Sequence, residues 1–242
     1  MLNKFGIDGV YVVHARHGFE QREAWVKELF KQYNIPFEFV SEEDSVLPLE
    51  ELTANYFPTN IKDTLSKGVI LCTLSHFVCY EKIVKQQKGL SLIFEDDPCF
   101  LKDFPKRMER VVNEAKTLKE GFIISLENTT LEFPSWRKVR KGQYLYKAMK
   151  GRCAGAYLVD LKAANVMLER LKKEKCRKAI DIWHNIILQS GTIDMDMYWS
   201  HPPLVEQASH NGKLNSLIQQ SRSRFQWLAQ KFYKMYILKW FR

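Results

Sequence analysis

The chain has 242 residues, 45% of them apolar and 27% charged, and its 37 Lys and Arg exceed its 28 Asp and Glu to give a formal charge of +9. This composition excludes a disordered chain, and the length is sufficient for a sizeable core in one large domain or two small ones. No segment approaches the roughly 18 uncharged apolar residues of a membrane-spanning helix, and we expect no secretory signal at the start. The five cysteines form no CxxC pair. This is typical of free thiols in a reducing compartment, so we expect a cytoplasmic protein.

Strand and helix patterns alternate along the first half of the chain. Short β-rich runs predict strands at 10–14, 37–40, 90–94 and 121–126, and apolar residues at helical spacing predict helices at 19–33, 69–88 and 104–119. The acidic, proline-containing segment 41–63 is expected to be an irregular connection, and Gly89 is expected to end the second helix. This alternation predicts an α/β domain with a mainly parallel sheet.

The second half of the chain is less regular. Its patterns predict a strand at 156–159, helices at 161–172 and 180–189, and a strand or loop at 192–198. From Leu214 onward, apolar residues recur at helical spacing and predict a C-terminal amphipathic helix. We therefore divide the chain into a domain at 1–212 and a tail at 213–242.

Three consecutive carboxylates, Glu95, Asp96 and Asp97, follow the predicted strand 90–94. They are expected at the carboxyl end of that strand, where open α/β sheets bind ligands. Because adjacent anions repel one another and oxygen ligands suit Mg²⁺ or Mn²⁺, a divalent cation would stabilise this arrangement. In an extended segment, Glu95 and Asp97 face one side and Asp96 faces the other. The alternative is a solvated acidic turn.

Several short segments resemble glycosyltransferase family 25, which contains bacterial lipooligosaccharide galactosyltransferases and collagen galactosyltransferases. They are the first strand and turn at 10–22, LCTLSH at 71–76, LIFEDD at 92–97, GAYLV at 155–159 with the helix after it, AID at 179–181 and PPLVEQ at 202–207. Each segment is short, but all of them occur in the order that the family has.

The resemblance implies a GT-A-like nucleotide-sugar fold and transfer of a sugar with inversion, most often from UDP-galactose. It implies that Glu95 and Asp97 hold Mn²⁺ or Mg²⁺, with Asp96 as an indirect ligand, to stabilise the leaving nucleotide diphosphate. Inversion also requires a general base for the acceptor hydroxyl, and the match to the family's Pro-x-Asp element assigns this role to Asp181. Asp194 and Asp196 are the other candidates. A structural role for Asp181 at a helix start is the alternative.

Four further residues are candidates for binding the nucleotide-sugar donor. Arg16 and Arg22 follow the first predicted strand, and their guanidinium groups suit a pyrophosphate. Ser75 and His76 belong to the helix start that resembles the family. For the two arginines the alternative is an exposed charge at the start of a helix.

Two histidine-containing arrangements are candidate metal sites. His201 precedes Pro202 and Pro203, on a late loop where GT-A enzymes often supply a metal ligand; a solvated loop histidine is the alternative. Cys72, His76 and Cys79 share one helical face and would suit zinc, but buried Cys and His are common on helix faces without a metal.

The tail 213–242 contains seven basic residues, no acidic residue and seven aromatic residues, so residues 1–212 carry only +2 of the formal charge. A basic, aromatic amphipathic helix suits the surface of an anionic membrane. The basic segment 137–152 also lacks acidic residues. A helix docked on the domain with a solvated cationic face is one alternative, and a nucleic-acid-binding tail is another. We expect no nucleic-acid partner, because no nucleic-acid-binding motif is present.

These features and the resemblance to family 25 together imply a metal-dependent inverting glycosyltransferase, expected to be a galactosyltransferase, peripheral on the inner face of the cytoplasmic membrane. Its expected partners are a UDP-sugar, a lipopolysaccharide or other glycan or glycolipid acceptor, and the anionic membrane surface. A metal-dependent phosphoesterase and a non-catalytic membrane-surface binding protein are the alternatives. The two enzyme hypotheses require the carboxylates of Glu95, Asp96 and Asp97, whereas the binding-protein hypothesis does not.

Overall fold

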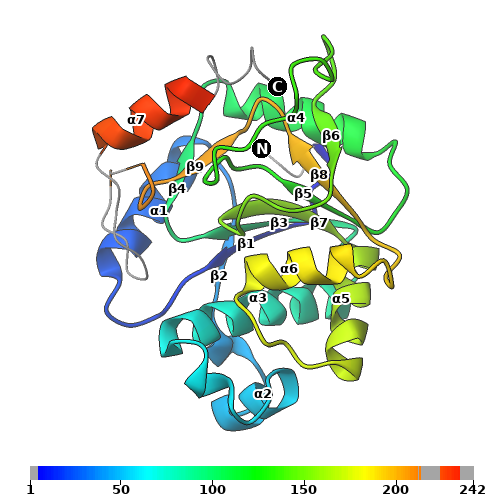
Figure 1. The fold of residues 1–242 in the computed structure, drawn as a ribbon. Coiled ribbons are helices and arrows are strands. Elements are labelled where there is room, and N and C mark those ends of the chain that lie inside the picture. The colour runs from blue at the N-terminus through cyan, green and yellow to red at the C-terminus, as the bar shows by residue number, and fades with distance from the viewer. Residues whose placement is uncertain (1–4, 212, 214–223, 235–242) are drawn as a thin grey trace.

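The computed structural model describes residues 5–211, 213 and 224–234, which form a central sheet with helices on both faces (Figure 1). The strands are β1 (Gly9–Val13), β2 (Glu38–Val40), β3 (Leu90–Glu95), β4 (Pro98–Phe100), β5 (Phe122–Ser125), β6 (Leu145–Ala148), β7 (Ala156–Asp160), β8 (Asp196–Ser200) and β9 (Val205–Gln207). The α-helices are α1 (Glu20–Gln32), α2 (Leu49–Tyr56), α3 (Lys67–Lys85), α4 (Phe104–Ala115), α5 (Leu161–Lys173), α6 (Ile180–Gln189) and α7 (Arg224–Phe232).

The central sheet has the strand order β2-β1-β3-β7-β5-β8-β6, and β4 and β9 form a separate pair. β1 runs parallel to β2 and β3, and β5 runs parallel to β8, whereas β7 and β6 run antiparallel to their neighbours. Five of these seven strands therefore point in the same direction, which confirms the predicted α/β class. The carboxyl ends of β1, β3 and β5 meet at one edge of the sheet, and the candidate site lies there.

The segment 41–63 is more regular than predicted. It contains α2 and two 3₁₀ turns, η2 (Glu42–Asp44) and η3 (Ile61–Asp63). Ser41 and Asp44 form a capping box at η2, and Leu52 of α2 is buried in the core. An eight-residue helix has too few periodic positions to be recognised against an acidic background. The prediction of an irregular connection is therefore wrong for this segment.

The second predicted helix ends earlier than expected. α3 stops at Lys85 because Gln87 adopts a left-handed conformation, with φ of 54°. Gln87 thus takes the role that the sequence suggests for Gly89.

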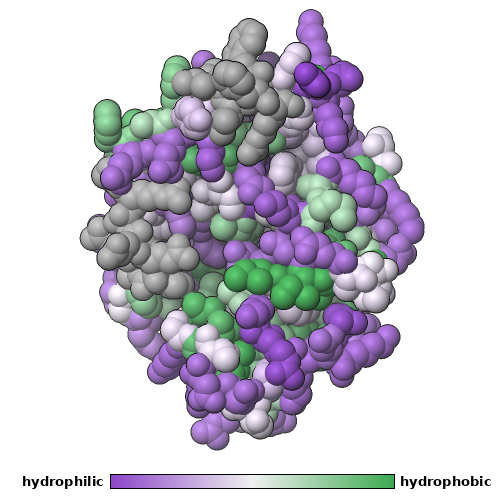
Figure 2. Space-filling view, in the orientation of Figure 1, coloured by the Kyte–Doolittle hydropathy of each residue, from purple (hydrophilic) through white to green (hydrophobic). Residues whose placement is uncertain are grey.

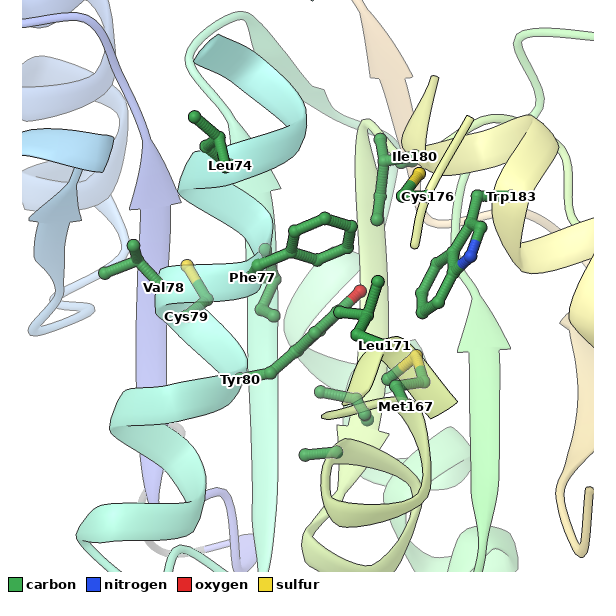
Figure 3. Packing of buried hydrophobic residues seen from close by; sticks show 14 of the residues in the cluster. Leu74, Phe77, Val78, Cys79, Tyr80, Met167, Leu171, Cys176, Ile180 and Trp183 are labelled. Carbon is green, nitrogen blue, oxygen red and sulfur yellow. The ribbon is translucent and has the colours of Figure 1, made fainter. Parts of the chain in front are cut away.

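One hydrophobic cluster lies on each face of the sheet. On one face, Phe77 and Tyr80 of α3 pack with Met167 of α5 and Trp183 of α6 (Figure 3). On the other face, residues of α1 and α4 pack against the alternate side chains of β1 and β3. This packing holds α3 against the sheet, with its His76 next to the carboxyl end of β3.

The described part of the tail is a helix docked on the domain. Trp227 of α7 is 1% exposed, and Lys231 forms a salt bridge with Glu206 of β9. The predicted helix start near Leu214 and the residues from 235 onward lie outside the described part of the chain. Within the part that is described, no helix combines the length and apolarity required to cross a membrane.

Candidate active site

Glu95 is the last residue of β3, and Asp96 and Asp97 follow it in a bend. Ile93 belongs to the hydrophobic cluster on the α3 side of the sheet, and Phe94 belongs to the cluster on the α1 side. Side chains alternate along a strand, so Glu95 turns towards α3 and Asp96 towards α1. The opposite directions expected for Glu95 and Asp96 are therefore found here, whereas Asp97 lies beyond the strand and its side remains a prediction.

The positive charge beside these carboxylates comes from α1. Arg22 Nη1 donates a hydrogen bond to Asp96 Oδ1, and Arg22 Nη2 lies 4.0 Å from Asp97 Oδ2. The other oxygen of Asp96 is 2.9 Å from His14 Nδ1, just after β1. Asp97 Oδ2 accepts a 2.9 Å hydrogen bond from the backbone N–H of Ser209. Arg22, a predicted pyrophosphate ligand, is thus engaged with the carboxylates themselves.

Glu95 is in a different electrostatic environment from Asp96. Its Oε2 accepts a 2.7 Å hydrogen bond from Gln207 Nε2, and its Oε1 lies 3.8 Å from His76 Nε2. Burial, together with the negative charges of Asp97 and its neighbours, raises the pKa of Glu95 to about 8. The excess negative charge at this point favours a bound cation.

Another buried carboxyl group, Glu127, supports this arrangement. It follows β5, is 0% exposed, and accepts a 2.6 Å hydrogen bond from the backbone N–H of Gly155. Burial raises the pKa of Glu127 to about 8, so the group is mostly protonated at neutral pH. The Thr129 hydroxyl contacts both Glu127 and, at 2.8 Å, Gln207 Oε1. Gln207 Oε1 can only accept, so the Thr129 hydroxyl donates to it, and this contact orients the Gln207 amide towards Glu95.

The sequence prediction assigns no role to Glu127 or Thr129. Glu127 nevertheless follows a predicted strand, at 121–126, and this same signal singles out Glu95. The position of Thr129 depends on the loop after that strand, and the loop has no sequence pattern that predicts its conformation.

Gly155 leaves room for Gln207, and its substitution provides a test of the network. A Cβ atom at Gly155 would lie 2.4 Å from Gln207 Cδ and 2.5 Å from Nε2. Gly155→Ala is therefore expected to displace the amide from Glu95, to lower stability by about 1–3 kcal/mol and to reduce turnover. Thermal unfolding and steady-state kinetics measure both effects.

Gly68→Ala is the matched control, because a Cβ atom there meets nothing within 4 Å and Gly68 lies in the first turn of α3. It should leave stability unchanged or raise it by up to about 1 kcal/mol. A Gly155→Ala variant as stable and active as the native chain would contradict the role of Gln207.

The ring of His76 is fixed by a chain of buried polar groups. His76 Nδ1 lies 2.8 Å from the Tyr157 hydroxyl, which lies 2.7 Å from the Tyr80 hydroxyl, and this in turn lies 2.7 Å from His184 Nε2. Burial lowers the pKa of both histidines to about 3, so both rings are neutral. His76 thus presents a fixed, uncharged ring to Glu95.

Asp181, the predicted base, lies in the first turn of α6 and close to the same cluster. Its negative charge contributes to raising the pKa of Glu95 and of Cys72, and the Cys153 thiol donates a hydrogen bond to it. The carboxylate that the match to the family selects thus lies at a helix start and acts electrostatically on Glu95, and its role as the base stays a prediction.

The other two candidate bases lie elsewhere. Asp194 pairs with Lys119 and Lys162 at 2.6 Å each and lines a pocket together with Leu90, at the beginning of β3. The length of β3 separates this pocket from Glu95 by about 17 Å. Asp196 is the first residue of β8, so it too lies at the edge of the sheet opposite the carboxylates.

The remaining predicted residues occupy separate positions around the site. Arg16 is half exposed and pairs with Asp44 of η2. Ser75 Oγ lies 3.1 Å from Glu42 Oε2. His201 follows β8 and packs against aromatic rings, and the two strands between β8 and β3 separate it from Glu95 by about 14 Å of sheet.

The predicted zinc trio is not formed as a unit. Cys79 is 0% exposed and belongs to the hydrophobic cluster beneath the sheet, where it packs among apolar side chains. Cys72 and His76 instead face Glu95, and these three residues offer ligand atoms that all lie within 4.8 Å of one another.

A sequence model of glycosyltransferase family 25, described as "LPS biosynthesis protein", matches residues 17–183. The chain belongs to glycosyltransferase family 25. The segments that resemble the family meet at the site: His76 of 71–76 and Gln207 of 202–207 both face Glu95, and the backbone N–H of Glu95 donates to the carbonyl of Gly155.

Several curated relatives in family 25 are similar to this chain over part of their length. The lipooligosaccharide biosynthesis protein lic2B of Haemophilus influenzae is 29% identical over 163 residues, 63% of this chain and 59% of that protein. Procollagen galactosyltransferase 1 of Danio rerio is 22% identical over 213 residues, 83% of this chain and 34% of that protein. Inactive glycosyltransferase 25 family member 3 of Mus musculus is 28% identical over 120 residues, 47% of this chain and 20% of that protein. The chain thus spans less than two thirds of each of these relatives.

Proposed function

We propose that this protein is an inverting glycosyltransferase with a GT-A-like fold that moves galactose from UDP-galactose to a lipopolysaccharide or other surface-glycan acceptor. The proposal is carried by the position of Glu95, Asp96 and Asp97 at the carboxyl end of β3 in a chain of family 25. The names of the relatives supply the class of sugar and acceptor. Some relatives are named inactive, so the proposal requires these carboxylates to function.

The donor set around Glu95 fits a divalent cation, Mn²⁺ or Mg²⁺. Glu95 and Asp97 offer carboxylate oxygens, and a cation beside them would offset the burial and the repulsion that together raise the pKa of Glu95. When bound, the cation would stabilise the negative charge on the departing nucleotide diphosphate. Asp96 would act indirectly, since Arg22 and His14 occupy its two oxygens. His201 lies too far from Glu95 to be a ligand of the same cation.

The protein's own side chains supply the remaining parts of the reaction. We assign the diphosphate contact to Arg16, whose side chain is 51% exposed, while Arg22 holds the carboxylates in place. We assign the general base to Asp181, which would accept the proton of the acceptor hydroxyl as the new glycosidic bond forms. The negative charge of Asp181 acts to raise the pKa of Glu95 and of His76, and this effect supports placing Asp181 near the proposed donor site.

The surface beside Asp181 suits an acceptor with apolar and anionic parts. Ile182 and Ile186 on α6 are 46% and 47% exposed, and Figure 2 shows hydrophobic side chains gathered over this helix. The backbone N–H of Gly151 donates a 2.7 Å hydrogen bond to Asn185 of α6, which places the end of the basic segment 137–152 beside the helix. A phosphorylated glycolipid matches this combination.

We further propose that residues 213–242 attach the protein to the anionic inner face of the cytoplasmic membrane. Phe225 and Leu228 of α7 are 80% and 53% exposed. Replacing both by Ser is expected to weaken binding to phosphatidylglycerol vesicles by roughly tenfold or more in a sedimentation assay. Val46→Ser, at a site that is 88% exposed, is the control and should bind normally. Equal binding by the double variant would contradict the role of α7.

Release of UDP from UDP-galactose, measured with lipooligosaccharide as acceptor and Mn²⁺ present, tests the proposed activity. UDP-glucose and UDP-N-acetylglucosamine serve as comparison donors. Asp97→Asn should lower turnover by roughly 10²-fold or more while the melting temperature is retained. Full activity of Asp97→Asn would contradict the role of the carboxylates. Hydrolysis of phosphate esters in place of sugar transfer would favour a phosphoesterase, which no feature of the described site otherwise supports.

A further inference from the structure

Cys72, His76 and Glu95 bring three metal-ligating groups together on the α3 side of the site. The thiol sulfur, an imidazole nitrogen and a carboxylate oxygen all lie within 4.8 Å of one another, and His76 Nε2 is 3.8 Å from Glu95 Oε1. Cys72 and His76 are one turn apart on α3, so they share one face of the helix. Ligands bound to one Zn²⁺ at about 2.0–2.3 Å lie roughly 3.3–3.8 Å apart. Small side-chain rotations are therefore sufficient to close the site.

The nitrogen of His76 that faces this space lacks a hydrogen-bond partner in the described structure. His76 is 0% exposed, and its Nε2 is buried and unpaired. If Nδ1 carries the proton, it donates to Tyr157, Tyr157 donates to Tyr80, and Tyr80 donates to His184 Nε2. This direction leaves a lone pair on Nε2. If every hydrogen bond of this chain ran the other way, His76 Nε2 would carry the proton. That proton would have no acceptor, because the 3.8 Å distance from Nε2 to Glu95 Oε1 is too long for a hydrogen bond.

We propose that Cys72 Sγ, His76 Nε2 and the carboxylate of Glu95 bind one Zn²⁺, with a fourth position open to solvent or ligand. Sulfur and imidazole ligands favour Zn²⁺ over Mg²⁺ and Mn²⁺, which prefer oxygen. On binding, the metal replaces the thiol proton of Cys72, and this proton passes to the solvent. Tyr157 holds the ring in the tautomer that ligates, as outer-shell partners of metal-bound histidines do.

Glu95 is common to this site and to the proposed Mn²⁺ or Mg²⁺ site with Asp97. Zn²⁺ bound on the α3 side withdraws Glu95 from the other cation and so inhibits sugar transfer. This regulatory consequence rests on the proposed function, whereas binding of Zn²⁺ does not.

Titration of the metal-free full chain with Co²⁺, a spectroscopic substitute for Zn²⁺, tests the site without donor or acceptor. We expect one bound equivalent, a thiolate-to-cobalt charge-transfer band, and loss of this band when Zn²⁺ is added. Cys72→Ser should lose the band and bind Zn²⁺ at least about tenfold more weakly in competition with a chromogenic chelator. Cys79→Ala, on the same helix but in the core, is the matched control and should keep both properties.

His76→Gln provides a second variant, which should keep the thiolate band but require at least about tenfold more Co²⁺ to reach it. Circular dichroism establishes that each variant is folded. The proposal is overturned if the native chain gives no charge-transfer band, or if the band persists in Cys72→Ser. A chain that binds Co²⁺ in this way but fails to respond to UDP would leave the zinc site standing and overturn the proposed function.

Discussion

Replacing Asp181 by Asn is expected to lower kcat for sugar transfer by roughly 10²–10⁴-fold, the usual contribution of a general base. Asn keeps the size of the side chain, and its carbonyl oxygen still accepts the hydrogen bond from Cys153, but it cannot take a proton from the acceptor. KM for the donor should change little, because the donor's cation is assigned to Glu95 and Asp97. Steady-state kinetics with the donor and the acceptor varied separately distinguish these effects.

Asp194→Asn is the matched control for this prediction. Lys119 and Lys162 flank Asp194 and hold its pKa at about 2, and the pocket that it lines lies at the opposite end of β3. Its loss should leave kcat unchanged. A large loss of kcat in Asp194→Asn, with little change in Asp181→Asn, would show that the base is assigned to the wrong residue.

Trp227→Ala is expected to destabilise the whole domain by about 3–5 kcal/mol, which corresponds to a decrease in Tm of roughly 6–15 °C. Trp227 is 1% exposed, and its helix also provides Lys231 as the partner of the buried Glu206. Glu206 precedes Gln207, the residue that orients Glu95, so loosening α7 should also reduce activity. Differential scanning calorimetry measures the stability change.

The neighbouring residue Leu228 provides the control for Trp227. Leu228 is 53% exposed, and Leu228→Ala should change stability by no more than about 0.5 kcal/mol. If Trp227→Ala unfolds at the same temperature as Leu228→Ala, α7 contributes nothing to the domain. The same reasoning makes deletion of 213–242 a poor test of membrane binding, because the deletion removes Trp227 and Lys231 together.

The parts of the site that the sequence predicted are those encoded by local patterns. A buried apolar strand followed by Glu95, Asp96 and Asp97 has one plausible placement in an α/β sheet, at the carboxyl end of the strand. The alternation of side chains also predicts that Glu95 and Asp96 face opposite sides. Asp181 is assigned as the base through its match to the family, and this role stays a prediction.

The contacts that the sequence did not predict depend on strand order and on the packing of helices against the sheet. β7 lies between β3 and β5, and it brings Gly155, at the start of that strand, to both Glu95 and Glu127. Every residue of β7 is buried, so its hydrophobic pattern is the same whether the strand runs parallel or antiparallel to its neighbours. Arg22 likewise suits phosphate in the sequence, and only the packing of α1 shows that it neutralises Asp96.

A thermal-shift comparison of UDP, GDP, CMP and ADP, each with and without Mn²⁺, tests the central claim most directly. A ligand that binds only the folded state stabilises it by about 2.7 kcal/mol at a hundredfold excess over Kd. The account predicts stabilisation by UDP that requires Mn²⁺ and disappears in Asp97→Asn, with smaller effects of the other three nucleotides. If none of the four nucleotides stabilises the native chain, or if UDP stabilises Asp97→Asn equally well, the proposed nucleotide-sugar site at the end of β3 is wrong.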